Sequence, residues 1–199
     1  MKGAYKAMKL AIIVGSTRPN RQTLKEAKWV EKTAKEMADI KPQIIDLADY
    51  PMAFFDEPMS PRYNPDRVVG ADAKKWLDAI NDFDAYIFVT PEYNHSITGV
   101  LKNALDYITS ELYHKPSAVV SHGSVGGARA AVQLKEILSE SRTVVIPNAV
   151  AFIGVSEGVD DEGNINATLK ANPYGPQAAL NSTLEELKWY SDALAQARG

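Results

Sequence analysis

The chain of 199 residues contains no cysteine. This absence excludes a disulfide framework, a cysteine-based zinc site and a thiol nucleophile, and it fits a reducing compartment. We therefore expect a cytoplasmic protein. The chain has 3 histidines, and no two of them have the H-x-x-x-H spacing, so we predict no transition-metal site.

Long apolar runs and a strong net charge are also missing. No apolar run is long enough to span a bilayer, and the lysines of MKGAYKAMKL are not followed by the apolar region of a signal peptide. Met8 is an alternative start, which would make residues 1–7 a flexible extension. The formal net charge of -3 indicates neither a nucleic-acid partner nor a membrane partner.

Two nucleotide-binding motifs are absent. The sequence has no G-x-x-x-x-G-K-[ST], which argues against a P-loop NTPase, and no G-x-G-x-x-G after the first apolar run, which argues against a Rossmann dinucleotide site. Residues 154–158, GVSEG, match the nucleophile elbow of serine hydrolases. That elbow needs a helix directly after the serine and a histidine later in the chain, but VDDEGN follows and every histidine precedes.

What the chain does contain is a regular alternation of apolar runs and segments with helical periodicity. Its length and its 45% of hydrophobic residues suit one domain over residues 1–199, without repeats or a dividing linker. The predicted strands are 9–14, 43–47, 85–90, 117–121 and 143–147, the last with a continuation over 150–155. The predicted helices are 22–37, 66–80, 99–112, 128–138 and 178–197, with a proline-rich loop at 50–66 and an irregular loop at 156–176.

This order predicts a doubly wound α/β domain: a five-stranded parallel sheet with strand order 2-1-3-4-5 and helices on both faces. Ligands of such sheets bind outside the carboxyl ends of the strands, where the strand order reverses. Three loops, 15–23, 90–99 and 121–128, are predicted to meet there.

The first loop, GSTRPNRQT, leaves a strand and begins a helix. Free amides at a helix N-terminus attract anions. Side chains of Ser16, Thr17, Gln22 and Thr23 add donors, and Arg18 and Arg21 can grip a phosphate. The alternative is a capped helix with two solvated arginines. The position after the first strand favours a phosphate site, and a single short loop indicates a mononucleotide.

The second loop is TPEYNHSITG. Pro91 lacks an N–H and ends the strand, so we expect free amides at Glu92, Tyr93 and Asn94 to face a ligand, with the Tyr93 ring beside them. The alternative is a wet loop with an aromatic lid, in which Asn94 and Ser96 cap the next helix. The residues alone leave both open.

The third loop, SHGSVGG, has Gly123, Gly126 and Gly127, which allow left-handed backbone and close approach to a flat ligand. A tight strand-to-helix turn would need the same glycines. We expect Arg129, just beyond, to be structural or at a subunit contact.

Together, VGSTRPNRQT, TPEYNHSITGVLKNALDYI and KPSAVVSHGSVGGARAAVQL resemble the NADPH-dependent FMN reductase family, a flavodoxin-like group that includes quinone, azo-dye and chromate reductases. The resemblance covers about residues 8–155. It implies an FMN-dependent oxidoreductase that passes hydride from NADPH or NADH through bound FMN to quinones or similar small acceptors. The flavin carries the chemistry, so no catalytic side chain is predicted.

The resemblance also implies cofactor-binding residues. The phosphate would be held by Ser16, Arg18, Arg21, Gln22 and Thr23. The isoalloxazine would be bordered by Pro91, Glu92, Tyr93 and Asn94 and, at its other edge, by Ser121, His122, Gly123 and Gly126. Two positions depart from many relatives: Thr98 stands in place of a proline, and His122 in place of a tyrosine.

Two other functions fit the sequence less well. A flavodoxin-type electron carrier would bind FMN without NAD(P)H turnover, but its phosphate loop normally lacks arginine and its surface is strongly acidic. A signalling receiver would need acidic residues where Gly15 and Ser16 stand. The resemblance further implies a homodimer, with a homotetramer as the alternative, formed through the helix at 99–112 and the aromatic residues at 50–63.

Overall fold

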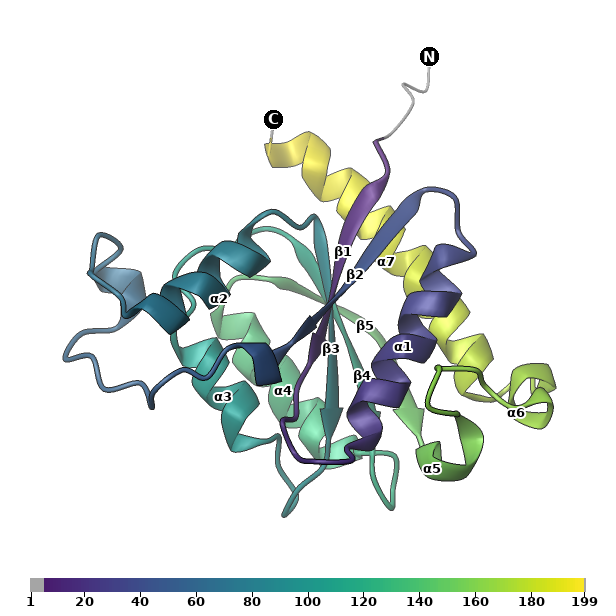
Figure 1. The fold of residues 1–199 in the computed structure, drawn as a ribbon. Coiled ribbons are helices and arrows are strands. Elements are labelled where there is room, and N and C mark those ends of the chain that lie inside the picture. Colours follow the sequence, from purple (N-terminus) through teal and green to yellow (C-terminus); the bar gives the residue numbers. More distant parts are fainter. Residues whose placement is uncertain (1–5, 199) are drawn as a thin grey trace.

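The computed structural model describes residues 6–198, so most of the predicted extension at residues 1–7 lies outside the described residues. Five parallel strands form one sheet in the order β2-β1-β3-β4-β5 (Figure 1). Their bounds are β1 Met8–Val14, β2 Ile40–Asp46, β3 Ala85–Pro91, β4 Pro116–His122 and β5 Val144–Phe152. The predicted fold class and strand order are confirmed.

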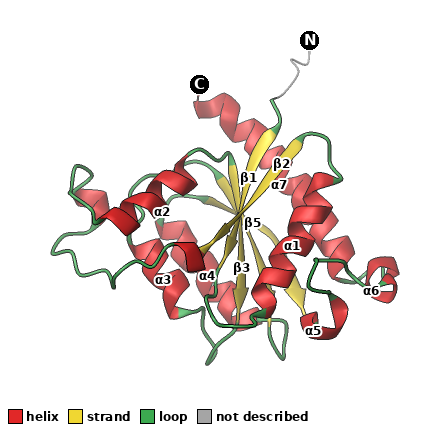
Figure 2. Cartoon of the chain, viewed as in Figure 1, coloured by secondary structure: helices red, strands yellow, loops and turns green. Residues whose placement is uncertain are grey.

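Helices cover both faces of the sheet (Figure 2). The α-helices are α1 Gln22–Lys35, α2 Ala71–Asn81, α3 Gly99–Asp106, α4 Ala128–Glu140, α5 Val155–Gly158, α6 Ala167–Ala171 and α7 Pro176–Arg198. Two 3-10 turns, η1 Leu47–Asp49 and η2 Pro61–Tyr63, lie in the proline-rich segment.

The core has two halves, one on each face of the sheet. Alternate residues of β1 divide between them: Ile13 packs with α2, α3 and α4, whereas Ile12 packs with α1 and α7. Since both sides of each central strand are buried, these strands are continuous apolar runs.

Several predicted boundaries were wrong. Helix α3 ends at Asp106 instead of 112. The following residues Tyr107, Ile108 and Leu112 are loop residues buried in the core. Their apolar pattern continues that of the helix, and the predicted helix was therefore too long. Helix α2 begins at Ala71 instead of 66, since the side chain of Arg67 binds the Tyr107 carbonyl and holds the preceding segment in a loop.

The carboxyl-terminal part of the chain also differs from its prediction. Strand β5 is continuous across Pro147, which an edge strand tolerates, with an irregular register opposite Ser117 and Val119. The segment predicted as irregular, 156–176, contains most of α5 and all of α6. Helix α5 includes Ser156, but the backbone becomes extended at Val159, so no elbow helix follows that serine.

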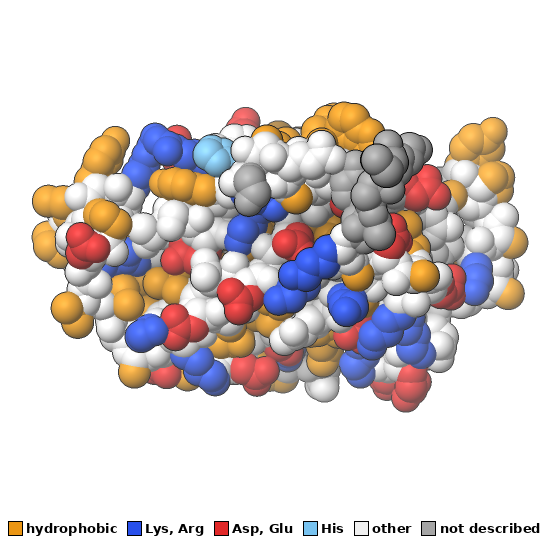
Figure 3. All heavy atoms as spheres, turned by 90° about the horizontal axis from the view of Figure 1, so that it is seen from above, with side chains coloured by type: hydrophobic (Ala, Val, Ile, Leu, Met, Phe, Trp, Pro, Cys, Tyr) orange, Lys and Arg blue, Asp and Glu red, His pale blue; other side chains and the backbone are white. Residues whose placement is uncertain are grey.

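The end of the molecule seen from above in Figure 3 has charged and apolar side chains interspersed, without one dominant charged field. Within residues 6–198, none of the helices has both the length and the apolar character needed to cross a bilayer.

Candidate functional site

A cavity of about 460 Å³ lies at the carboxyl ends of β1, β3 and β4, where the three loops meet. This volume is within the usual range for small-molecule sites. The lining residues are Arg18, Pro19, Asn20, Arg21, Gln22, Pro91, Glu92, Tyr93, His122 and Gly123. The structure therefore brings together residues that were predicted from three separate segments.

The wall formed by the first loop includes the N-terminus of α1. Arg21 at the N-cap makes no side-chain capping bond, and the first turn has no acidic residue. Among residues 6–198, the fully buried hydroxyl of Thr23 has no hydrogen-bond partner, and neither has the side-chain oxygen of Gln22. An uncapped N-terminus with free amides and a free hydroxyl donor suits an anion.

Helices α3 and α4, which also begin at this edge, are capped. At α3, Thr98 accepts a hydrogen bond from the Leu101 amide and donates to the Gly15 carbonyl over 2.5 Å, which ties α3 to the end of β1. The hydroxyl supplies a cap that a proline could not. Thr98 therefore has a structural role that its departure from the family pattern did not reveal.

At α4, the Glu92 carboxylate accepts a hydrogen bond of 2.9 Å from the Arg129 amide and one of 2.8 Å from its guanidinium. Desolvation alone would raise the pKa of Glu92, but these bonds and the one from the Ala130 amide bring it below its ordinary value. The Glu92 side chain thus caps α4, and Arg129 is structural, as expected.

The two arginines of the first loop differ. Arg21 forms an ion pair with Asp46 at the end of β2, which engages one end of its guanidinium. Arg18 makes no ion pair with residues 6–198, and its guanidinium carbon lies 5.9 Å from the centre of the Tyr93 ring. Of the two arginines, Arg18 is consequently the more available for a ligand.

The second loop is a tight hairpin. Tyr93 and Ser96 exchange backbone hydrogen bonds of 2.9 and 3.0 Å, and between them Asn94 and His95 have φ of 50° and 66°. Two central residues with positive φ are typical of a type I′ turn. The prediction of three free amides was wrong: the Glu92 amide donates to the His122 carbonyl, and the Tyr93 amide to Ser96.

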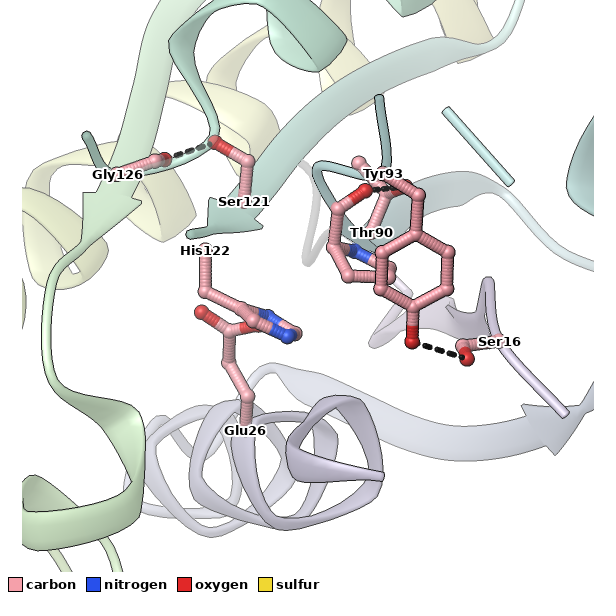
Figure 4. Close-up of polar contacts among 8 residues, drawn as sticks. Ser16, Glu26, Thr90, Tyr93, Ser121, His122 and Gly126 are labelled. Carbon is pink, nitrogen blue, oxygen red and sulfur yellow. Dashed lines mark hydrogen bonds and ion pairs between the residues drawn. The ribbon is translucent and has the colours of Figure 1, made fainter. Parts of the chain in front are cut away.

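The third loop is shaped by close backbone packing. Gly127 has φ of 73°, and a Cβ there would lie 2.8 Å from the His122 carbonyl oxygen. The Ser121 hydroxyl is buried and donates to the Gly126 carbonyl over 2.8 Å, which closes the loop (Figure 4). Ser121 and Gly126 therefore shape the cavity wall from behind instead of lining it.

Ser16 likewise lies behind the lining. Its hydroxyl is 3.3 Å from the Tyr93 hydroxyl, which joins the first loop to the second (Figure 4). Thr23 is buried beneath the same wall, and Asn94 is exposed at the tip of the hairpin. These three residues, like Ser121 and Gly126, are not among the residues that line the cavity.

Sequence reasoning missed Glu26. This residue of α1 is fully buried, and its carboxylate lies 2.7 Å from Nδ1 of His122 (Figure 4). Desolvation by burial raises the pKa of Glu26, although the hydrogen bond and charge of His122 act in the opposite direction. A signal was present: Glu26 follows Thr23 by three residues and precedes Val30 by four, so a charge lies on the buried helix face.

Fold and site together define a flavodoxin-like flavoprotein, in which an uncapped helix N-terminus and a cavity meet at the reversal of strand order. A model of the NADPH-dependent FMN reductase family matches residues 8–157. The chain belongs to this family.

Relatives support the assignment. The chain is 33% identical over 194 residues to the NAD(P)H-dependent FMN reductase ntnL of Nectria sp, covering 90% of this chain and 95% of the relative. It is 32% identical over 169 residues to a quinone reductase of Pseudomonas putida, covering 79% and 84%. The flavoenzyme NAD(P)H:(acceptor) oxidoreductase FerB of Paracoccus denitrificans shares the fold, with a TM-score of 0.73, 23% identity and coverage of 92% and 98%.

The predicted function is thereby confirmed: the protein is an FMN-dependent, NAD(P)H-using oxidoreductase that acts on small molecules. These relatives also decide against the flavodoxin-type electron carrier.

Proposed function

We propose that the cavity at the ends of β1, β3 and β4 holds the FMN, with the phosphate at the N-terminus of α1. The observation that carries this proposal is the difference in capping. Thr98 and Glu92 cap α3 and α4, while the N-terminus of α1 has no side-chain capping bond and no acidic residue in its first turn, and it buries the unpartnered Thr23 hydroxyl. A phosphate would satisfy both the amides and the hydroxyl.

The remaining predicted residues would then have distinct roles. Arg18 would add positive charge at the phosphate, and Arg21 would form a rigid N-cap held by Asp46. Tyr93 would offer its ring to the flat part of the ligand, held in place by the Ser16 hydroxyl. Gly123, whose added Cβ would lie 3.3 Å from that of Glu92, leaves space between the second and third loops.

The FMN held there would supply the redox chemistry, the transfer of hydride between NAD(P)H and a small acceptor. The chain's own contribution is binding and orientation: the first loop fixes the phosphate, and the hairpin and third loop hold the ring in a narrow cavity. We infer quinones as the acceptor class from the quinone reductase of Pseudomonas putida. A single nicotinamide and acceptor site would give ping-pong kinetics.

The direct test is to load the purified protein with FMN and record the visible spectrum, then add NADPH or NADH, and finally a quinone. We expect a yellow protein that is bleached by NAD(P)H and recovers its colour with the quinone. A protein that binds no FMN would contradict the proposed site. Bleaching by dithionite but not by NAD(P)H would contradict the proposed turnover.

A matched pair of arginines tests the phosphate assignment. The guanidinium carbons of Arg18 and Arg62 lie 5.9 and 6.0 Å from tyrosine rings, but Arg62 is in the proline-rich segment and pairs with Glu140. Arg18→Ala should weaken FMN binding far more than Arg62→Ala, with little effect on the midpoint of thermal unfolding. Equal FMN affinity in the two variants would remove Arg18 from the site.

Three further expectations are part of this proposal. They are one domain over the whole chain, a location in the cytoplasm, and a homodimer, with a homotetramer as the alternative. The exposed side chains of Phe54 and Tyr63 in the proline-rich segment support a subunit contact. Sedimentation equilibrium would decide the oligomeric state, and a monomer at all concentrations would contradict the dimer.

A further inference from the structure

His122 connects three parts of the site. Its carbonyl accepts a hydrogen bond of 2.9 Å from the Glu92 amide, which anchors the hairpin, and its side chain binds Glu26 of α1. The ring is also part of the cavity lining. Figure 4 shows Glu26 reaching from α1 to the His122 ring, with Tyr93 on the other side of the opening.

The contact with Glu26 determines which imidazole nitrogen a ligand can meet. The carboxylate is 2.7 Å from Nδ1, so when Glu26 is ionised, Nδ1 carries the proton of this hydrogen bond and donates it to the carboxylate. Nε2 is then the nitrogen left for a molecule in the cavity. The second oxygen of Glu26 is buried without a hydrogen-bond partner, so within residues 6–198 His122 is the group that holds the carboxylate in place.

The other charged groups of the cavity are already compensated or lie apart from this pair. Arg21 of the first loop is paired with Asp46, and Glu92 of the second loop is paired with Arg129 of α4. Arg18 lies over the Tyr93 ring, whose hydroxyl contacts Ser16. The electrostatic partner acting on Glu26 is His122.

The charge of the pair therefore depends on its protons. With neutral His122 and ionised Glu26 it carries one negative charge, which repels an anionic ligand. With one more proton it is neutral and offers Nε2–H as a donor. A negatively charged ring in the cavity favours the second form, because opposite charges and hydrogen bonding stabilise the protonated imidazole.

We propose that Glu26 is a positioning residue for His122, and that the pair takes up one proton from solvent when the heteroaromatic ring in the cavity becomes negatively charged. This inference rests on the proposed placement of FMN. It assigns to these two residues a role in balancing charge during reduction, and it gives the histidine at this position a function.

The experiment is a titration of the midpoint potential of bound FMN against pH, between about pH 5 and 8, the range in which ordinary histidines change charge. Each additional proton taken up with the electron pair changes the equilibrium constant of reduction tenfold for every pH unit. For a two-electron couple this corresponds to about 30 mV per pH unit. In the pH range where the pair takes up its proton, the wild-type slope should exceed that of His122→Asn by about this amount.

Glu26→Gln provides the readout specific to positioning. The amide keeps the shape and can still accept from Nδ1, but it lacks the negative charge that favours the second proton. The steep part of the curve should therefore move to lower pH. His114→Asn is the matched control, since His114 is exposed, has φ of 57° and lies outside the cavity lining. It should reproduce the wild-type curve.

A second measurement needs no variant. In ¹⁵N-imidazole NMR of the FMN-loaded wild type, Nδ1 of His122 should stay protonated while Nε2 gains its proton after reduction. A proton on Nε2 at every pH with Nδ1 bare would overturn the proposal. So would equal potential slopes for wild type and His122→Asn. If the wild type binds no FMN, the proposed site fails; if it binds FMN with equal slopes, this inference alone fails.

Discussion

Two helix N-termini at the same edge of the sheet have opposite electrostatic states. Helix α4 is closed by the Glu92 carboxylate, which comes from a neighbouring loop and binds the Arg129 amide. Helix α1 has no side-chain cap and no acidic residue in its first turn, although it leaves Thr23 buried and unpartnered. The fold neutralises one positive helix end internally and leaves the other available for a ligand.

This difference separates structural from binding residues inside one cavity. Glu92 lines the cavity and Thr98 lies at the start of α3, but their side chains are engaged by α4 and α3. Gln22 and Thr23 belong to the open end. Variants that close the open end or open a closed one test whether the distinction is functional.

The largest effect is expected from Gln22→Glu, which places a carboxylate in the first turn of α1. It would compete with the phosphate for the same amides, and a lost charged hydrogen bond costs about 1.5–3 kcal/mol, or roughly 10- to 100-fold in affinity. Isothermal titration calorimetry should show weaker binding of FMN but not of riboflavin.

The control for Gln22→Glu is Gln43→Glu, which makes the same charge change at an exposed position of β2. Its FMN affinity should equal that of the wild type. Equal losses of FMN and riboflavin affinity in Gln22→Glu would contradict a phosphate at α1.

The next effect concerns the closed end of α3. Thr98→Ala removes the cap at the Leu101 amide and the bond to Gly15, and we expect a loss of about 1–2 kcal/mol in the free energy of unfolding, measured by urea denaturation. Thr98→Ser keeps the hydroxyl and should recover most of it. If Ala and Ser variants have the same stability, the cap is not what Thr98 contributes.

Glu92→Gln should have a smaller effect, and its pH dependence identifies the cause. Because the pKa of Glu92 is lowered in the fold, ionised Glu92 stabilises the protein above the ordinary value of 4.5, and this stabilisation is lost as the pH falls through the lowered value. The wild type should therefore melt higher than Glu92→Gln at neutral pH, and the difference should shrink on acidification. A difference that grows in acid would refute this role.

The smallest effect is expected at the tip of the hairpin. His95 has φ of 66°, which glycine adopts without steric cost, so His95→Gly should stabilise the protein by about 0.5 kcal/mol. His95→Val should destabilise it, since a β-branched residue fits this conformation poorly. Thermal unfolding of both would measure the sign; the same sign in both would argue against a type I′ turn.

The strand order and the meeting of the three loops followed from the sequence because each central strand is an apolar run and each loop follows one of them. The hairpin could not be predicted in the same way. The apolar pattern carries no information on φ, and the exchange of hydrogen bonds between Tyr93 and Ser96 consumed an amide that had been assigned to a ligand.

Side-chain contacts between residues far apart in the sequence could not be predicted either. The bonds from His122 to Glu26 and from Arg129 to Glu92 join residues 96 and 37 positions apart. Their partners are fixed by the packing of α1 and α4 against the sheet. Local periodicity placed Glu26 on the buried face of α1, but only the folded structure shows which group compensates its charge.

The central claim is that the open end of α1 holds the FMN phosphate, and a crystal structure of the FMN complex tests it most directly. The account predicts phosphate oxygens within hydrogen-bonding distance of the first-turn amides of α1 and of the Thr23 hydroxyl, with the Glu92–Arg129 pair intact. A phosphate bound instead to Arg129 at the N-terminus of α4, with Glu92 displaced, would contradict it.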